Sequence, residues 1–124
     1  YQLVTEFPGK SSQTGGKAQK HLQLAQSYLE QNYRHSTCTV ASLCDHLGLS
    51  RSYLYTIFKK GLTISPQDYL TRLRMEEARQ RLRASTEPVR QIAGEVGYHD
   101  EFTFSKAFKR YTGFSPSAYR QTRY

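Results

Sequence analysis

The sequence VASLCDHLG at residues 40–48 is followed 49 positions later by VRQIAGEVG at residues 89–97, and the two segments share one pattern. Apolar residues stand at the first, fourth and eighth positions, a small residue stands at the fifth, and a glycine stands at the ninth. Apolar residues at three- and four-residue steps predict an amphipathic helix. A glycine directly after such a helix predicts its end, because glycine adopts the left-handed backbone conformation at little cost. The sequence therefore predicts one type of short helix that is used twice.

The repeat continues beyond the two glycines into a second helix in each copy. Ser50 and Asp100 stand where N-cap residues belong, and Leu54 and Phe104 follow four positions later as inward-facing apolar residues. Beyond the turn the offset is 50, because the second copy has one extra turn residue. Two helices joined at a bend, with a small residue where they cross, form a helix-turn-helix. Any small helical bundle can yield one such pattern, so the interpretation rests on the two aligned copies.

The rest of the chain also has the pattern of helices. Residues 17–33 carry an apolar stripe at helical spacing, and Ser65-Pro66 and Ser115-Pro116 are cap-plus-proline signals for two further helices. No window shows the period-two alternation of strands. The predicted fold class is all-α, with seven helices in two helix-turn-helix subdomains joined by a long central linker helix. The expected division is a flexible linker or tail of an upstream domain at 1–16, the first subdomain at 17–64, the linker helix at 65–84 and the second subdomain at 85–124.

The composition favours an anionic partner. Lys and Arg number 18 against 10 Asp and Glu, which gives a formal charge of +8. The excess is uneven, because no acidic residue follows Glu101 whereas five basic residues do. Localised positive charge is typical of proteins that bind nucleic acid or an anionic membrane face. No apolar stretch approaches the roughly 18 residues that a membrane-spanning helix needs, so we expect no membrane segment.

Cysteine and histidine residues give no pattern for a metal site. Cys38 and Cys44 are separated by five residues, whereas zinc sites have a spacing of roughly two to four. Cys44 holds the small position of the first repeat, which favours a core thiol. Two cysteines are too few for a disulfide framework and suit a reducing compartment, so we expect a cytoplasmic protein. No catalytic arrangement stands out, and we expect no metal, no cofactor and no enzymatic activity.

From about Lys17 to Arg120 the sequence resembles the DNA-binding domain of the AraC/XylS family of bacterial transcription regulators. The resemblance implies that the second helix of each copy, the recognition helix, enters the major groove on one face of DNA. At Thr63 the family usually has the glycine that the second copy supplies as Gly113, so the resemblance does not predict the turn before Ser65. The matching stretches, of which the closing one is the most specific, are SRSYL (50–54), FKK (58–60), YL (69–70), RMEEA (74–78), Leu82, IA (92–93), GY (97–98), FSKAFKRYTGFSP (104–116) and YR (119–120).

The resemblance also assigns positions that face DNA. Arginine can donate two hydrogen bonds to guanine, hydroxyls can donate or accept, glutamate can accept from cytosine, and apolar groups suit the thymine methyl. The predicted base-reading residues are Arg51, Ser52, Tyr55 and Thr56 in the first recognition helix and Glu101, Phe102, Thr103 and Lys106 in the second. The predicted phosphate contacts, which position the protein without reading sequence, are Lys59, Lys60, Lys109 and Arg110. For each residue the alternative is a solvated helix face, and Glu101 could instead complement the helix N-terminus.

The sequence thus predicts sequence-specific binding of a double-stranded DNA operator and regulation of transcription, with activation as the commoner role in the family. The family also implies an upstream sensor domain that binds a small-molecule effector, and a chain without an initial Met agrees with its absence. RNA polymerase is the expected protein partner. Two alternatives stay open. One is a protein-interaction module that mainly contacts RNA polymerase, and the other is the DNA-binding part of an alkyl-transfer repair enzyme.

Overall fold

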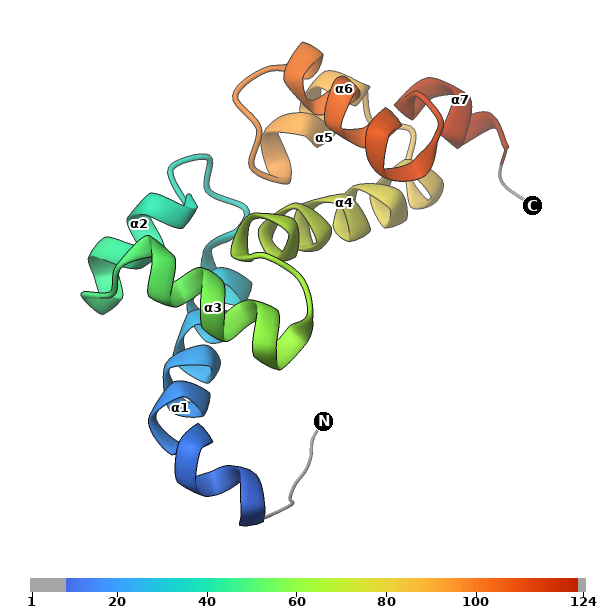
Figure 1. Cartoon of the computed structure of the whole chain (residues 1–124). Helices are drawn as coiled ribbons and strands as arrows, with labels where there is room; N and C mark the ends of the chain where they lie inside the picture. Colours follow the sequence, from blue (N-terminus) through green and yellow to red (C-terminus); the bar gives the residue numbers. More distant parts are fainter. Residues whose placement is uncertain (1–8, 123–124) are drawn as a thin grey trace.

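The structure is a computed structural model that describes residues 9–122, with side chains from residue 16 onward. This part of the chain contains seven helices and no strand, which confirms the predicted all-α class (Figure 1). The helices are α1 (Gly9–Asn32), α2 (Val40–Leu47), α3 (Arg51–Leu62), α4 (Pro66–Ala84), α5 (Val89–Glu95), α6 (Glu101–Thr112) and α7 (Pro116–Gln121).

The helix ends lie where the capping signals predict them. The side chains of Ser50, Ser65, Asp100 and Ser115 accept hydrogen bonds from the backbone three residues onward, at the starts of α3, α4, α6 and α7. Thr39 caps α2 in the same way. Each such cap satisfies a backbone amide that has no partner inside its own helix. The predicted helix-turn-helix geometry follows, with α2 and α3 forming the first motif and α5 and α6 forming the second.

Two hydrophobic cores form at the two ends of α4. The first core is made by α1, α2 and α3 with Leu70 of α4, and Leu54 and Phe58 of α3 are fully buried in it. The second core is made by α5, α6 and α7 with Met75, Ala78 and Leu82 of α4. Burying a side chain such as Phe58 stabilises the fold by about 2–3 kcal/mol. The first and second motifs therefore lie at opposite ends of one shared helix (Figure 1).

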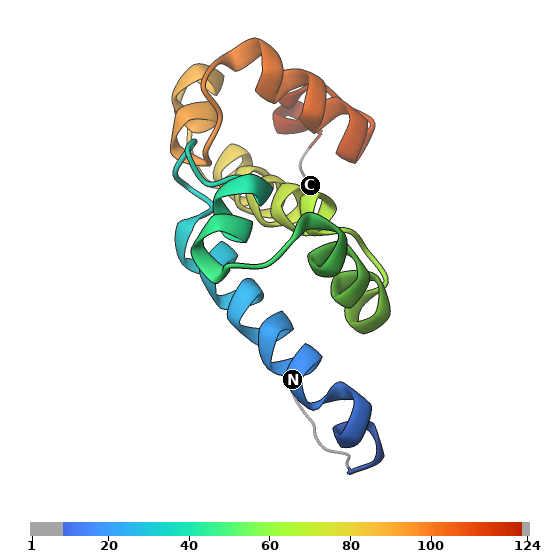
Figure 2. The ribbon, with the colours of Figure 1, turned by 60° about the vertical axis from the view of Figure 1, so that its left-hand side comes forward.

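The first helix is longer than the sequence predicts. Residues 9–16 were expected to form part of a flexible linker, but they lie in α1, which begins at Gly9. Nucleation is the costly step of helix formation, whereas extension gains one hydrogen bond for each residue added. Because Leu22, Ala25 and Leu29 fix α1 against the first core, the helix extends through the Gly- and Ser-rich segment, and its start projects away from the other helices (Figures 1 and 2). The rest of the predicted linker, residues 1–8, lies outside the described residues.

Candidate nucleic-acid interface

The outward face of α3 carries all four base-reading residues predicted in the first motif. Leu54, Ile57 and Phe58 are buried on the opposite face of α3, and this burial fixes the direction in which the outward face points. Tyr55 is 51% exposed, which is high for an aromatic residue. The exposed set is Arg51, Ser52, Tyr55 and Thr56.

A groove runs along this face, between α3 and the start of α4. Its volume is about 660 Å³, and its walls include all four predicted base-reading residues of α3 together with Val40, Ser65, Pro66 and Gln67. It is open to solvent, and hydroxyl, amide and guanidinium groups that can hydrogen-bond to a ligand lie in its walls beside apolar surface.

The outward face of α6 carries the four residues predicted in the second motif. Phe104 and Phe108 are fully buried beneath it. Phe102 is 72% exposed, and the ammonium group of Lys106 lies 5.1 Å from the centroid of its ring. An aromatic ring this exposed gains free energy when a partner covers it, about 25 cal/mol for each Å² removed from water. The exposed set is Glu101, Phe102, Thr103 and Lys106.

Two of the predicted readers already use their hydroxyl protons within the protein. Oγ1 of Thr56 donates to the carbonyl oxygen of Ser52 at 3.0 Å. Oγ1 of Thr103 donates to Oδ2 of Asp100 at 3.0 Å, and the amide of Thr103 donates to Oδ1 at 2.7 Å. These bonds from the backbone and side chain of Thr103 hold the pKa of Asp100 below its usual value. A partner can therefore meet these two hydroxyls most readily as acceptors.

The basic residues predicted to contact phosphates lie at the C-terminal ends of α3 and α6. All four side chains are exposed, and no ion pair between them and an acidic side chain occurs in the described part of the chain. Positive charge at a helix C-terminus also complements the helix dipole. The two motifs thus share one design, an exposed outward face that ends in two cations. These cations are Lys59 and Lys60 in α3 and Lys109 and Arg110 in α6.

Two arginines of the matching stretches have structural roles. Arg74 is buried, with Nε 2.8 Å from the carbonyl oxygen of Tyr33 and Nη2 2.8 Å from that of Cys38. Nε of Arg120 donates to the carbonyl oxygen of Leu82 at 3.0 Å. Neither arginine belongs to the outward faces of the motifs.

Candidate metal ligands and membrane-spanning helices were sought among the described residues. No group of three or more His, Cys, Asp or Glu side chains that could hold a metal ion occurs within the described range. Cys38 and Cys44 are buried free thiols, and burial raises the pKa of Cys38. Among residues 9–122, no helix combines the length and the apolar character needed to cross a membrane.

Comparison with known proteins gives one consistent family. Residues 43–122 match the model of a helix-turn-helix domain. The chain is 51% identical over 122 residues to the raffinose operon transcriptional regulatory protein RafR of Pediococcus pentosaceus. That alignment covers 98% of this chain and 44% of RafR, so the chain spans less than half the length of this relative.

Two solved structures share the fold. A transcriptional regulator with an AraC-type DNA-binding domain from Chromobacterium violaceum is 25% identical, with a TM-score of 0.69 over 86% of this chain and 94% of that one. The DNA-binding domain of AdpA, solved in complex with a target DNA, is 24% identical, with a TM-score of 0.73 over 81% of this chain and 89% of that one. At this identity the likeness to AdpA shows a common fold.

Proposed function

Because the chain belongs to the AraC family of helix-turn-helix transcription regulators, we propose that it binds a double-stranded DNA operator through both motifs, with α3 and α6 in adjacent segments of the major groove. The observation that carries this proposal is the shared design of the two motifs: each has an exposed, largely polar outward face that ends in two cations. Neighbouring major-groove segments on one face of DNA lie about one helical turn, roughly 10 base pairs, apart. Family membership also agrees with the expectation that the chain is not an enzyme.

The base-reading roles follow from the chemistry of the exposed faces. Arg51 is suited to donate two hydrogen bonds to O6 and N7 of a guanine, and Glu101 to accept from N4 of a cytosine. Phe102 is suited to cover a thymine methyl group, which would bury its exposed ring. Because the hydroxyl protons of Thr56 and Thr103 are already donated, both residues would accept from a base donor. Ser52, Tyr55 and Lys106 complete the proposed set.

The phosphate-contacting roles fall to the four basic residues at the helix ends. Each neutralised phosphate releases a counterion, so the binding constant is expected to fall steeply as the salt concentration rises. Lys59 and Lys60 would hold one backbone segment, and Lys109 and Arg110 the next. An affinity that stays constant between low and moderate salt would contradict this assignment.

Regulation by the whole protein is a further part of the proposal. We expect activation of transcription in a bacterial cytoplasm, with RNA polymerase as the protein partner and an effector bound by a domain upstream of this chain. The basis for these expectations is the family resemblance.

The decisive experiment is selection of bound sequences from a random DNA pool, with the unaltered chain and with two variants. Thr56→Ala should relax the preference at one base pair in the half-site read by α3, and Lys106→Ala should do so in the half-site read by α6. Each loss should be about tenfold, because a good base contact contributes about 1–3 kcal/mol of discrimination. The controls are Thr37→Ala and Lys20→Ala, which make the same changes at exposed positions outside both motifs.

The outcome separates DNA reading from protein interaction. If Thr56→Ala and Lys106→Ala leave every preferred base unchanged, the assignment of these readers is wrong. The module that mainly contacts RNA polymerase would then be the better explanation of the two exposed faces.

A further inference from the structure

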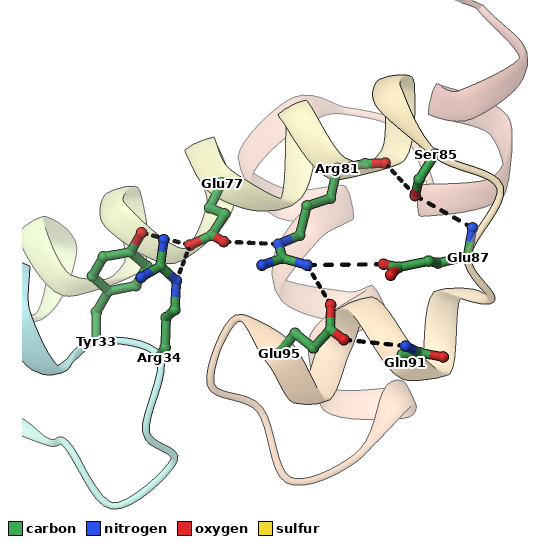
Figure 3. A network of polar contacts seen from close by, with 8 residues as sticks. All are labelled: Tyr33, Arg34, Glu77, Arg81, Ser85, Glu87, Gln91 and Glu95. Carbon is green, nitrogen blue, oxygen red and sulfur yellow. Dashed lines mark hydrogen bonds and ion pairs between the residues drawn. The ribbon is translucent and has the colours of Figure 1, made fainter.

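A network of polar contacts centred on Glu77 lies between the two motifs (Figure 3). Its carboxylate oxygen Oε1 accepts from the hydroxyl of Tyr33 at 2.5 Å and from Nε of Arg34 at 2.7 Å. Both donors directly follow α1, and Tyr33 packs against the first core. Glu77 therefore ties α4 to the part of the chain that carries the first motif.

The second oxygen of Glu77 continues the network toward the second motif. Oε2 accepts from Nε of Arg81 at 2.7 Å. Nη1 of Arg81 forms ion pairs with Glu95 of α5 and, at 3.8 Å, with Glu87 in the loop before α5. Nε2 of Gln91 in turn donates to Glu95 at 3.1 Å. One continuous series of contacts thus runs from the end of α1, across α4, to α5 (Figure 3).

Glu77 is more buried than the adjacent Glu76, and its carboxylate is held in the ionised form by hydrogen bonds. The side chain of Glu77 is 11% exposed, whereas that of Glu76 is 48% exposed. Burial alone would raise the pKa of Glu77, but the hydrogen bonds from Tyr33, Arg34 and Arg81 outweigh it and hold the pKa below its usual value. Hydrogen bonds to an ionised group away from solvent are about twice as strong as neutral ones. The ionised carboxylate therefore holds three donors, from Tyr33, Arg34 and Arg81, in fixed positions.

A second contact between the two halves of the molecule lies beside this network, at Gly97. A β-carbon placed on Gly97, in the turn of the second motif, would collide with the carbonyl oxygen of Tyr33 and lie 2.7 Å from Nε of Arg74. The turn of the second motif therefore touches the residue that donates to Glu77. This contact limits how closely the two motifs approach, whereas the ion pairs resist their separation and rotation.

We propose that Glu77 is a positioning residue that fixes the angle between α3 and α6 and so sets the spacing of the two DNA half-sites that the chain accepts. The inference rests on the proposed function, because spacing matters only if both helices read DNA. Inserting one base pair moves a half-site by 3.4 Å along the axis and rotates it by about 35° around it. A chain with a fixed angle between α3 and α6 cannot follow that rotation without breaking contacts.

The test measures affinity for DNA in which the two selected half-sites are separated by the preferred spacer or by one base pair more or fewer. The unaltered chain should lose about tenfold or more on the altered spacers, the order of one lost base contact. In Glu77→Gln, the amide cannot accept from all three donors with a full negative charge, so the loss should fall to about threefold or less. Base preferences within each half-site should stay unchanged, which a general loss of structure would not allow.

Glu76→Gln is the matched control. It makes the same chemical change one residue earlier on α4, but within the described part of the chain the carboxylate of Glu76 accepts hydrogen bonds from Nη1 of Arg79 and the hydroxyl of Tyr111. Neither partner belongs to the first motif or to the end of α1. The spacer dependence of Glu76→Gln should therefore equal that of the unaltered chain.

A second variant keeps the proposal testable if Glu77→Gln fails to fold. Arg34→Gln removes one of the two hydrogen bonds that tie Glu77 to the end of α1, at a side chain that is 58% exposed, and it should relax the spacer dependence in the same direction. If Glu77→Gln and Arg34→Gln both keep the spacer dependence of the unaltered chain, or if Glu76→Gln relaxes it equally, the inference is overturned while the proposed function stands. If the unaltered chain prefers no bases in either half-site, the proposed function itself fails.

Discussion

At Gly48, in the turn of the first motif, an added β-carbon would meet no atom within 4 Å, whereas at Gly97, in the turn of the second motif, it would collide with the backbone of Tyr33. Both glycines have positive φ, 68° and 108°. Gly48 is therefore needed only for its backbone conformation, whereas Gly97 is also needed for a close approach between distant parts of the chain. Equivalent residues of a repeat can thus share a backbone conformation, while only one of them is also constrained by packing against a distant part of the chain.

The C-terminal caps of the two recognition helices also differ, and here the first motif has the more demanding position. Thr63 is the C-cap residue after α3, with φ of 64°, and Gly113 is the C-cap residue after α6, with φ of 90°. A β-branched residue at positive φ is a genuine outlier, and the left-handed conformation costs an L-residue about 1–2 kcal/mol. The turn that the family resemblance does not predict thus keeps its left-handed form despite the threonine, and the first motif carries strain that the second avoids.

The largest expected effect is that of alanine at the two turn glycines. Gly97→Ala should destabilise the fold by about 3 kcal/mol or more, because the strain of positive φ adds to a clash with the backbone that cannot relax easily. Gly48→Ala should cost about 1 kcal/mol, since only the strain applies. Urea unfolding of both variants measures the difference. Equal losses would show that the contact between Gly97 and Tyr33 has no energetic weight.

The next effect in size is the pH dependence of the link between the motifs. Because the pKa of Glu77 is lowered from its ordinary value of 4.5, its stabilising contribution is complete above that value and is lost as the pH falls through the lower pKa of the folded state. Glu77→Gln should therefore be less stable than the unaltered chain at neutral pH, by about 1–3 kcal/mol. The two unfolding free energies should converge as the pH is lowered below about 4.5. Curves that stay parallel down to acid pH would contradict the ionised role of Glu77.

The smallest expected effect comes from exchanging the residue types at the two C-caps, Thr63 and Gly113. Thr63→Gly should stabilise the fold by about 0.5–1 kcal/mol, because relief of the strain is partly offset by the greater flexibility of glycine in the unfolded chain. Gly113→Thr should destabilise it by a similar amount. Thermal unfolding of the two variants and of the double exchange checks both signs. A loss of stability in Thr63→Gly would mean that the threonine hydroxyl, which donates to the carbonyl of Leu62, compensates for the strain.

The local structure was largely predictable because its signals are local. Caps such as Ser50 and Asp100 and the bend at Gly48 depend on a few neighbouring residues, and the structure has them where the sequence indicates. The burial of Met75 was not predicted, because α4 contributes Leu70 to the first core and Met75 to the second. A helix that serves two cores has no single apolar stripe.

Contacts between distant parts of the chain were only half predictable. The pairing of Glu77 with Arg81 follows from their four-residue spacing on one helix. The contacts of Glu77 with Tyr33 and Arg34 join residues more than 40 positions apart, and no periodicity signals them. The exposure of the proposed readers agrees with their assignment, but the bases they contact stay a prediction, because side-chain chemistry alone does not choose between compatible bases.

The outward faces of α3 and α6 occupy equivalent positions but present unlike groups. Where one has Arg51, the other has Glu101, and where one has Thr56, the other has Lys106. If both faces read DNA, the chain binds an asymmetric operator in one orientation only. Inverting the operator within a promoter would then turn the start of α1, and any domain joined to it, toward the opposite end of the DNA. The polarity of transcriptional control would thus be encoded in the difference between two related helices.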